Sequence, residues 1–493
     1  MTESKAYGRV YTPNYLVNHI LDYAGYSCYD NVIGKHIIDN SCGDGAFLIE
    51  IVKRYCNLFD DNVKILKEHL QTYIHGIEID NVECDKCIAN LNKIALQYGV
   101  TDVVWDVICA DTLSVSKYNA QMDYVVGNPP YVRVHNLESS YESVKSYLFA
   151  NGGMTDLYLV FFEIGFNMLK SNGQLCYITP ISWLNSVAAD NLRKYIIKYQ
   201  NLVALIDLGH FQAFDKITTY TIISHFKKSH NNSRFDYYTY NAVTKNRSLV
   251  ERLDLQDIYI DSHFYLGSKE DLAILSRIKT AKCSKYISVK NGFATLADAV
   301  FIGDNIPESP ITINVIKGST GKWYKCIYPY DKNGKPLQKD KIFENEEIRQ
   351  HLLMHKKTLL KGKDEFAGWY LFGRTQALAD VYRNKLSINS LVRTKEDLKL
   401  VELMSGEGIY SGLYIITNID ISLRDIKNIL TSDEFIAYVK LLKKYKSGGY
   451  YTFNTKDVEQ FINYKLTYLN KRNKYVIKST ISRQSPELFQ GIY

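Results

Sequence analysis

The 493-residue chain lacks the features that mark membrane, exported or disulfide-bonded proteins. It has no run of 18 or more apolar residues, so it offers no membrane span. Its first ten residues, MTESKAYGRV, are polar and contain no apolar signal region, which argues against export. The 9 cysteines follow no framework spacing and lie mostly in apolar runs, which is typical of reduced thiols. We therefore expect a cytoplasmic protein of two or three domains.

Metal-binding patterns are also weak. Cys84 and Cys87 form a lone CxxC, and no second pair or histidine partner stands at zinc spacing. Both cysteines lie on one turn of an expected amphipathic helix, so we interpret them as core-side thiols. We expect no metal site in this chain.

Proline is scarce, with 9 residues, yet two stand together at Pro129 and Pro130. They follow the apolar run DYVVG (123–127) and are flanked by Asn128 and Tyr131. Proline fixes φ and donates no backbone hydrogen bond, so the pair would rigidify a loop and leave nearby carbonyls free to accept. The motif is either a plain strand stop or a rigid acceptor site for a ligand with N–H groups.

The chemistry of this motif suits an NH2 group on a planar ring. Such an amine is a poor nucleophile because its lone pair is delocalised into the ring. The amide oxygen of Asn128 and the carbonyl of Pro129 could both accept its protons, which would localise that lone pair. Tyr131 would offer a face on which the ring stacks. Neither a covalent intermediate nor a metal is needed if the electrophile is an activated methyl group.

Polar residues at three expected strand ends would form a nucleoside site. In DNSCGDGAF (39–47), Gly43 and Gly45 let the backbone turn tightly between a strand and a helix. No third glycine stands at the dinucleotide spacing and no Gly-Lys-Ser/Thr follows, which disfavours a pyrophosphate or triphosphate ligand. Glu78 could accept the hydroxyls of a ribose, and Asp111 could accept from an exocyclic adenine amine. Each feature alone also fits a structural turn or a surface acid.

Strands and helices alternate along the first half of the chain, which favours a doubly wound sheet that binds ligands at its carboxyl edge. We therefore predict an α/β fold with a Rossmann-like core over 1–230, a polar linker over 231–262 and a mixed α+β domain over 263–493. The expected strands are 36–40, 73–79, 103–111, 123–128, 174–180, 202–209 and 218–226, and the expected helices are 46–55, 82–99, 155–173 and 344–360.

Charge is distributed unevenly between the two halves. Residues 1–230 contain 19 Lys and Arg against 24 Asp and Glu, whereas residues 231–493 contain 41 against 29. An acidic front half and a basic back half indicate small-molecule chemistry in front and polyanion binding behind. A lysine-rich overall composition, which the 40 tyrosines also fit, is the plain alternative.

Together these motifs resemble class I S-adenosylmethionine-dependent DNA methyltransferases that modify the N6 amine of adenine. Their order is similar to the gamma arrangement of restriction-modification enzymes, with cofactor motifs first, Asn-Pro-Pro-Tyr next and a target-recognition domain last. The resemblance covers residues 7–226 motif by motif and is looser over 263–493. It implies S-adenosyl-L-methionine as methyl donor, no metal, double-stranded DNA as partner and flipping of the target base.

The resemblance also implies a role for individual residues. GRVYTP (8–13) is similar to an N-terminal motif that lies over the methionine part of the cofactor. FDKITTYTIISHF (214–226) resembles a later motif whose phenylalanine stacks on the flipped base opposite the tyrosine, which implicates Phe214, although Phe211 is near. The implied catalytic residues are Asn128, Pro129, Pro130 and Tyr131, with Tyr131 and Phe214 stacking on the base, and the implied cofactor contacts are Thr12, Asp39, Cys42, Gly43, Gly45, Glu78 and Asp111.

The basic back half would then bind DNA phosphates. GWYLFGRTQAL (368–378) sets Arg374 among aromatic residues, and KKYKSGGYYTF (443–453) begins with Lys443 and Lys444. A solvated cationic face fits these segments equally well. We expect a monomer or weak dimer, and a cognate restriction endonuclease would be a separate chain because no nuclease cluster stands out here.

Three alternatives stay open. Asn-Pro-Pro-Tyr also occurs in methyltransferases acting on the glutamine amide of release factors, but those carry a helical domain in front, whereas GRVYTP begins by residue 8. An RNA adenine is a second candidate substrate. The third alternative is a modification subunit that needs a separate specificity subunit, against which the large basic C-terminal half argues.

Overall fold

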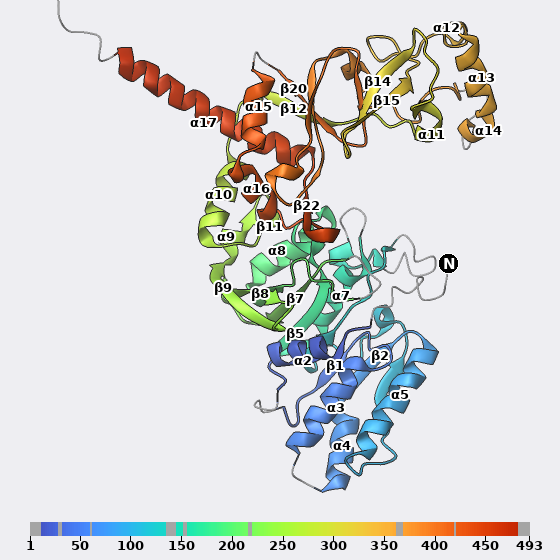
Figure 1. Ribbon diagram of the computed structural model, residues 1–493. Coiled ribbons are helices and arrows are strands. Elements are labelled where there is room, and N and C mark those ends of the chain that lie inside the picture. The colour runs from blue at the N-terminus through green and yellow to red at the C-terminus, as the bar shows by residue number, and fades with distance from the viewer. Residues whose placement is uncertain are drawn as a thin grey trace, which may run out of the picture. The chain divides into compact units, whose positions relative to one another are not determined.

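The chain forms two compact units, Met1–Ile274 and Leu275–Tyr493, which are described separately here (Figure 1). The computed structural model describes residues 11–27, 32–59, 62–134, 144–150, 155–214, 219–360, 368–418 and 421–481, with side chains up to residue 468 in the last range.

The first unit is built on a nine-stranded sheet of order β3-β2-β1-β4-β5-β7-β6-β8-β9. Its first five strands pair in parallel, β7 runs antiparallel to both β5 and β6, β6 pairs in parallel with β8, and β9 closes the sheet antiparallel to β8. The strands are β1 (Ile37–Asp39), β2 (Ile74–Glu78), β3 (Asp106–Cys109), β4 (Met122–Gly127), β5 (Leu169–Pro180), β6 (Leu202–Asp207), β7 (Thr221–Lys227), β8 (Arg234–Asn241) and β9 (Asn246–Asp254).

Helices cover this sheet and bury its central strands. All residues of β1 and β4 are buried, as expected for strands covered on both faces. Helices α3, α4 and α5 lie together beside β1 and β2 (Figure 1), and α7, which is apolar on nearly all sides, packs on β4 and β5. The helices are α2 (Asn14–Tyr23), α3 (Ala46–Leu58), α4 (Val63–Tyr73), α5 (Asn81–Leu96), α7 (Leu157–Met168), α8 (Asp190–Tyr199) and α9 (Leu255–Ile258), followed by the short pair β10 (Tyr259–Ile260) and β11 (His263–Phe264).

The predicted doubly wound, Rossmann-like core is confirmed, but two details of the prediction are wrong. The segment 231–262 is not a linker, because β8 and β9 within it complete the main sheet. Its polar residues alternate with buried ones such as Phe235 and Tyr237, as a strand near a sheet edge requires. The helix predicted over 155–173 ends at Met168, because β5 begins at Leu169.

The second unit is mixed α+β, as predicted. It contains two four-stranded sheets, of order β12-β20-β16-β18 and β13-β15-β14-β19, and a three-stranded sheet of order β17-β22-β21. Helix α10 (Lys269–Thr280) contains the boundary between the units. The strands are β12 (Ile287–Asn291), β13 (Ile302–Gly303), β14 (Thr312–Lys317), β15 (Lys322–Ile327), β16 (Lys385–Ile388), β17 (Leu391–Val392), β18 (Leu400–Leu403), β19 (Gly408–Tyr410), β20 (Leu413–Thr417), β21 (Tyr445–Lys446) and β22 (Tyr450–Thr452), and the helices are α11 (Asp298–Phe301), α12 (Lys339–Ile342), α13 (Glu346–Met354), α14 (Lys356–Leu359), α15 (Leu423–Leu430), α16 (Asp433–Leu441) and α17 (Thr455–Ile481).

A buried lysine organises the loop before β16. The Nζ atom of Lys385 donates to the carbonyls of Asp380, Val381 and Arg383 at 2.9, 2.9 and 3.0 Å. Its side chain is buried, and burial lowers the pKa of Lys385 to about 8. The carboxylate of Asp380 accepts at 2.7 Å from Tyr414 and forms a 2.7 Å ion pair with Lys290, which holds the other side of the loop.

Within the described ranges, no helix is long and apolar enough to cross a membrane.

Candidate functional site

The loop after β1 turns sharply into α3 and is kept open by glycine. Gly45, the N-cap of α3, has φ +94°, and a Cβ there would lie 2.8 Å from the Sγ atom of Cys87. Gly43 also has a positive φ, +53°, but a Cβ there would meet nothing within 4 Å. Cys42 is buried, and its backbone N–H donates to the carbonyl of Ile77, which joins the loop to β2. Glycine is therefore required at residue 45 for two reasons, conformation and space.

Glu78, at the end of β2, reaches this same loop. Its Oε2 atom accepts from the Gly43 N–H at 2.9 Å and its Oε1 atom from the Asp80 N–H at 3.0 Å. A carboxylate has about four lone-pair sites, so two backbone bonds leave capacity for further donors.

Asp39, the last residue of β1, is a buried carboxyl with a perturbed pKa. It is 1% exposed, and burial raises its pKa to about 7, although the Ser41 N–H donates to it at 3.0 Å and opposes the shift. The charge of Glu78 raises the pKa further. Gly127 passes close to it, since a Cβ there would lie 2.7 Å from an Asp39 carboxyl oxygen. The carboxyl therefore titrates near neutral pH.

Asp111 follows β3 and caps a short 3-10 turn. Its Oδ1 atom accepts from the Leu113 N–H at 3.0 Å. A cavity of about 100 Å³ lies beside this turn, lined by residues that include Ser114 and Tyr147. This volume is below the roughly 300–1,000 Å³ of typical ligand pockets, so the cavity alone defines no nucleoside site.

The Asn-Pro-Pro-Tyr segment leaves β4 and is tied to two other segments. The Nδ2 atom of Asn128 donates to the Thr12 Oγ1 atom at 3.2 Å. The Ser41 hydroxyl donates to the Asn128 carbonyl at 3.4 Å. Pro129 is buried and Pro130 is partly buried. The structure thus brings together the N-terminal Thr12, the loop after β1 and the predicted catalytic segment.

Tyr131 lies in an aromatic cluster that contains Phe214. Its ring centroid is 6.3 Å from that of Phe214 with the planes 69° apart, and 6.3 Å from that of Tyr158 with the planes 77° apart. Its hydroxyl donates to the Ile178 carbonyl at 3.2 Å. Between the two phenylalanines considered, Phe214 is the one against Tyr131, whereas Phe211 packs on Tyr240. The rings of Tyr131 and Phe214 meet edge to face and form no parallel slot. Residues 8–10 and 215–218 of the two flanking motifs lie outside the described residues.

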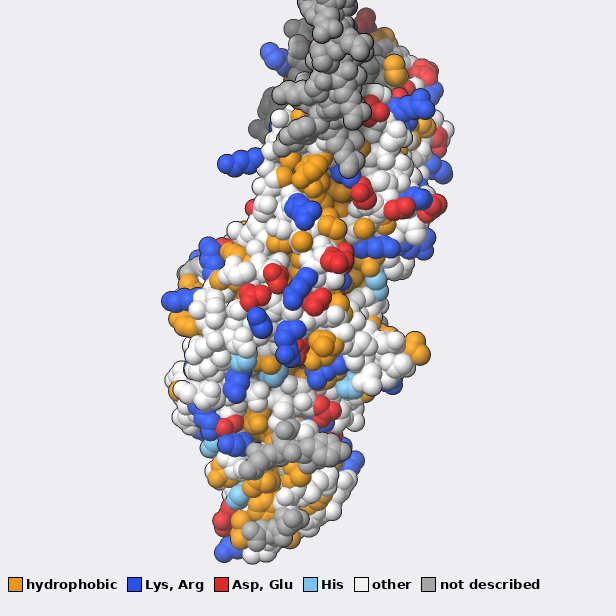
Figure 2. All heavy atoms as spheres, turned by 90° about the vertical axis from the view of Figure 1, so that its left-hand side faces the viewer, with side chains coloured by type: hydrophobic (Ala, Val, Ile, Leu, Met, Phe, Trp, Pro, Cys, Tyr) orange, Lys and Arg blue, Asp and Glu red, His pale blue; other side chains and the backbone are white. Residues whose placement is uncertain are grey.

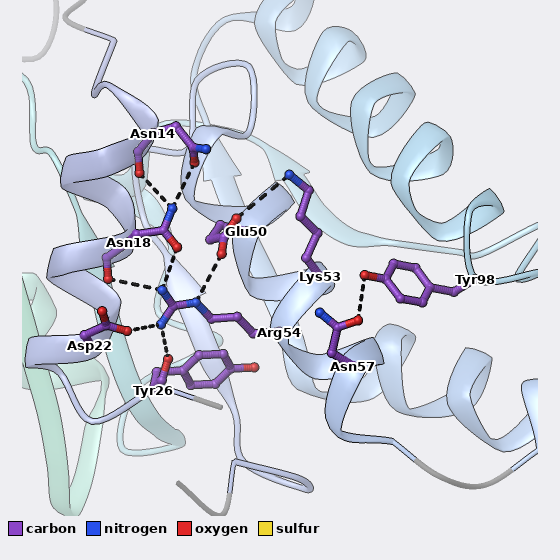
Figure 3. A network of polar contacts seen from close by, with 9 residues as sticks. All are labelled: Asn14, Asn18, Asp22, Tyr26, Glu50, Lys53, Arg54, Asn57 and Tyr98. Carbon is purple, nitrogen blue, oxygen red and sulfur yellow. Dashed lines mark hydrogen bonds and ion pairs between the residues drawn. The ribbon is translucent and has the colours of Figure 1, made fainter. Parts of the chain in front are cut away.

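Helix α2, which follows Thr12, is held by an arginine that sequence reasoning missed. The Nε atom of Arg54 donates to Glu50, its Nη1 atom to Asp22 and to the Tyr26 carbonyl, and its Nη2 atom to both oxygens of Asn18, at 2.6–3.2 Å (Figure 3). All five N–H groups of the guanidinium are therefore used. A lone arginine on an amphipathic helix carries no local signal for this role.

The candidate DNA-binding residues of the second unit have different environments. Arg374 is exposed, and Lys443 is partly buried. Lys444 instead forms a 2.5 Å ion pair with Asp457, a carboxylate that also pairs with Lys279 at 2.9 Å. A role for Lys444 in DNA binding stays a prediction, and a phosphate would have to compete with the buried carboxylate of Asp457 for its ammonium. On the face drawn in Figure 2, Lys and Arg are interspersed with Asp and Glu rather than gathered into one patch.

The described residues contain no group of three or more His, Cys, Asp or Glu side chains that could hold a metal ion. Cys84 and Cys87 are buried, in agreement with their interpretation as core thiols.

Comparison with known protein families matches part of this chain to one of them. Residues 45–214 match the Eco57I restriction-modification methylase family. This methylase segment contains Gly45, Glu78, Asp111, Asn128–Tyr131 and Phe214, whereas Thr12, Asp39, Cys42 and Gly43 precede it. The resemblance to restriction-modification methyltransferases is thereby confirmed.

Sequence similarity to known relatives extends beyond the methylase segment. The chain is 23% identical over 86% of its length to the Type II restriction enzyme and methyltransferase RM.Eco57I of Escherichia coli, covering 53% of that protein. It is 26% identical over 61% of its length to the Type II methyltransferase M.BstVI of Geobacillus stearothermophilus, covering 60% of that protein. The chain thus spans little more than half the length of these relatives.

Solved structures with a similar fold include MmeI, a Type IIL restriction-modification enzyme in complex with DNA. Its TM-score is 0.61 at 13% identity, and the match covers 90% of this chain and 63% of that one. The Type ISP restriction-modification enzyme LlaGI, in complex with a DNA substrate mimic, has a TM-score of 0.52 at 12% identity, with coverage of 94% and 55%. At these identities the likeness concerns the fold.

Proposed function

We propose that this chain is a DNA methyltransferase that transfers a methyl group from S-adenosyl-L-methionine to the N6 amine of an adenine flipped out of double-stranded DNA. The observation that carries the proposal is the position of Asn-Pro-Pro-Tyr. It follows β4 directly, and Asn128 is bonded to Thr12 and to Ser41 in the loop after β1. The family match over the same segment supports it.

The residues at the carboxyl edge of the sheet fit S-adenosyl-L-methionine. Gly43 carries no side chain and a Cβ there would meet nothing within 4 Å, so a ligand could approach this part of the loop's backbone closely. The buried carboxyl of Asp39, with its raised pKa, would be favoured in its charged form by a cationic ligand group, and the cofactor carries an ammonium and a sulfonium. Glu78 retains acceptor capacity for ribose hydroxyls. When bound, the cofactor supplies the activated methyl group.

The protein's own residues would activate and aim the amine. The Oδ1 atom of Asn128 and the carbonyl oxygen of Pro129 accept hydrogen bonds from its two N–H groups and so localise its lone pair. Tyr131 stacks on the adenine, and Phe214 turns its ring to complete the sandwich, since the two rings now meet at 69°. Stacking offsets the few kcal/mol that flipping costs, and much of the acceleration comes from orientation.

The second unit would bind the duplex. Arg374 is exposed among aromatic residues, which suits contact with a phosphate or a base edge. Replacing Arg374 with alanine should weaken DNA binding, and a loss of one phosphate contact would lower the salt slope by about one unit. An unchanged slope would leave Arg374 a base contact or no contact at all.

The test of the proposed function is methyl transfer by the purified chain. Labelled cofactor and mixed duplex DNA should yield N6-methyladenine after digestion to nucleosides. Label in RNA or in protein glutamine would support the rival substrates, and no transfer without an added subunit would support a modification subunit.

A matched pair of variants locates the site. Asn128→Ala should abolish transfer and leave cofactor binding largely intact, because its amide would contact the amine rather than the cofactor. The control is Asn428→Ala, which replaces an exposed asparagine on α15. Loss of cofactor binding in Asn128→Ala would mean that the site is misplaced.

A further inference from the structure

The amide of Asn128 has a fixed partner on one side, and this partner bears on catalysis if the proposed function holds. Its Nδ2 atom donates to the Thr12 Oγ1 atom at 3.2 Å, across 116 residues of sequence. Thr12 is 7% exposed, so this contact is shielded from solvent. The amide oxygen then lies on the side of the amide away from Thr12.

The two orientations of the amide are not equivalent for an amine substrate. An NH2 group held by its protons needs an acceptor, which is Oδ1. A half-turn of the amide would present Nδ2 instead, and two donors would face each other. A threonine hydroxyl can accept the Nδ2 proton, so Thr12 satisfies the donor end of the amide in the productive orientation and in a buried place.

The fold holds Thr12 by contacts that the described residues supply themselves. Pro13 caps α2, and its carbonyl accepts from the N–H groups of Leu16 and Val17 at 2.9 and 3.1 Å. These two side chains are fully buried in the core. Three bonds of Arg54, one to Asp22 and two to Asn18, fix the same helix from the side of α3, and a fourth holds Tyr26 just beyond its end (Figure 3). Thr12 thus stands directly before the N-cap of a helix whose position is fixed by these contacts.

We propose that Thr12 is a positioning residue, whose hydroxyl orients the amide of Asn128 so that Oδ1 faces the target amine. Thr12 then acts on the chemical step through Asn128. This role is distinct from the contact with the methionine part of the cofactor that the family resemblance implies. The two roles predict different kinetic effects.

The experiment compares Thr12→Val, which keeps the shape and removes the hydroxyl, with Thr12→Ser, which keeps the hydroxyl. The measured quantities are the single-turnover rate of methyl transfer at saturating cofactor and DNA, and the dissociation constant of S-adenosylhomocysteine by calorimetry. Thr12→Val should lower the rate roughly 10- to 100-fold, as a misaligned reacting group does. The dissociation constant of S-adenosylhomocysteine for this variant should stay within about threefold of wild type, because under this proposal the hydroxyl does not contact the cofactor. Thr12→Ser should restore most of the rate.

The outcomes separate this inference from the proposed function. A normal rate with a raised dissociation constant in Thr12→Val would overturn the inference and favour direct contact with the cofactor. So would a rate that serine does not restore. An inactive Asn128→Ala beside a fully active Thr12→Val would reject only the role of Thr12. Failure of the wild-type chain to methylate DNA would reject the proposed function itself. Retained S-adenosylhomocysteine binding shows that each variant is folded.

Discussion

Arg54→Met tests whether helix α2 is held in place by the guanidinium. The substitution keeps an unbranched apolar stem and removes all five donors. The matched control is Lys53→Met on the same helix. Lys53 is more exposed than Arg54 and forms one long ion pair, 3.9 Å, with Glu50. Both variants lose one positive charge, so a difference between them reports the hydrogen bonds.

The expected loss follows from the partners of Arg54. Three of its bonds go to neutral acceptors, the Tyr26 carbonyl and the two oxygens of Asn18, and each contributes about 1 kcal/mol. The bond to Glu50, whose side chain is 13% exposed, adds about 1 kcal/mol. Asp22 is 49% exposed and adds only a few tenths. Arg54→Met should therefore destabilise the first unit by about 4 kcal/mol, and Lys53→Met by less than about 0.5 kcal/mol.

Two measurements check this expectation. Urea unfolding gives the loss for the first unit, with the transition of the second unit followed separately because a chain of two units need not unfold in one step. Hydrogen–deuterium exchange should rise over residues 14–26 in Arg54→Met, since these residues lose their lateral attachment. Equal stability and equal exchange in the two variants would refute the assigned role of Arg54.

Three further substitutions test the loop and the sheet. Gly45→Ala should lower the free energy of unfolding by more than about 2 kcal/mol, because φ is +94° and the new Cβ would lie 2.8 Å from the Sγ atom of Cys87. Gly43→Ala should lower it by about 1 kcal/mol, because φ is +53° and the space around the new Cβ is open. Equal urea midpoints for the two variants would show that the contact with Cys87 is relieved by small shifts. Burial raises the pKa of Asp106, but hydrogen bonds from His75 and Lys117 outweigh this effect and lower the pKa to about 2. Its contribution to stability is present above the ordinary value of 3.8 and is lost as the pH falls towards about 2, so Asp106→Asn should flatten the acid branch of thermal stability; an unchanged acid branch would contradict the pairing with His75.

The parallel strands were predictable because burial on both faces leaves continuous apolar runs. β1 and β2 lie within the predicted segments 36–40 and 73–79, and β4 begins one residue before the predicted segment 123–128. β8 and β9 escaped prediction because they lie towards an edge of the sheet, where polar and aromatic residues alternate and the segment reads as a linker. Their assignment depends on pairing with β6, a contact that no local pattern encodes.

Part of the candidate site was likewise predictable from local sequence patterns, and part of it depends on contacts that form only in the folded chain. The loop at Gly43 and Gly45 and the Asn-Pro-Pro-Tyr segment are local patterns at strand ends, where a doubly wound sheet places its ligands. The bond between Thr12 and Asn128 joins residues 116 apart, and only the folded chain reveals it. For Lys444 the sequence suggested a free cation, but the folded chain commits it to Asp457.

Lys385 does for the loop before β16 what a bound cation does for carbonyl-lined loops in other proteins. Its ammonium gathers three main-chain oxygens around one positive charge. Because this ion is covalently attached, no salt has to supply it and no chelator can remove it. The shape of the loop therefore depends on one residue of the chain itself, and acylation of the Lys385 amine would be enough to remove the charge that holds the three carbonyls together.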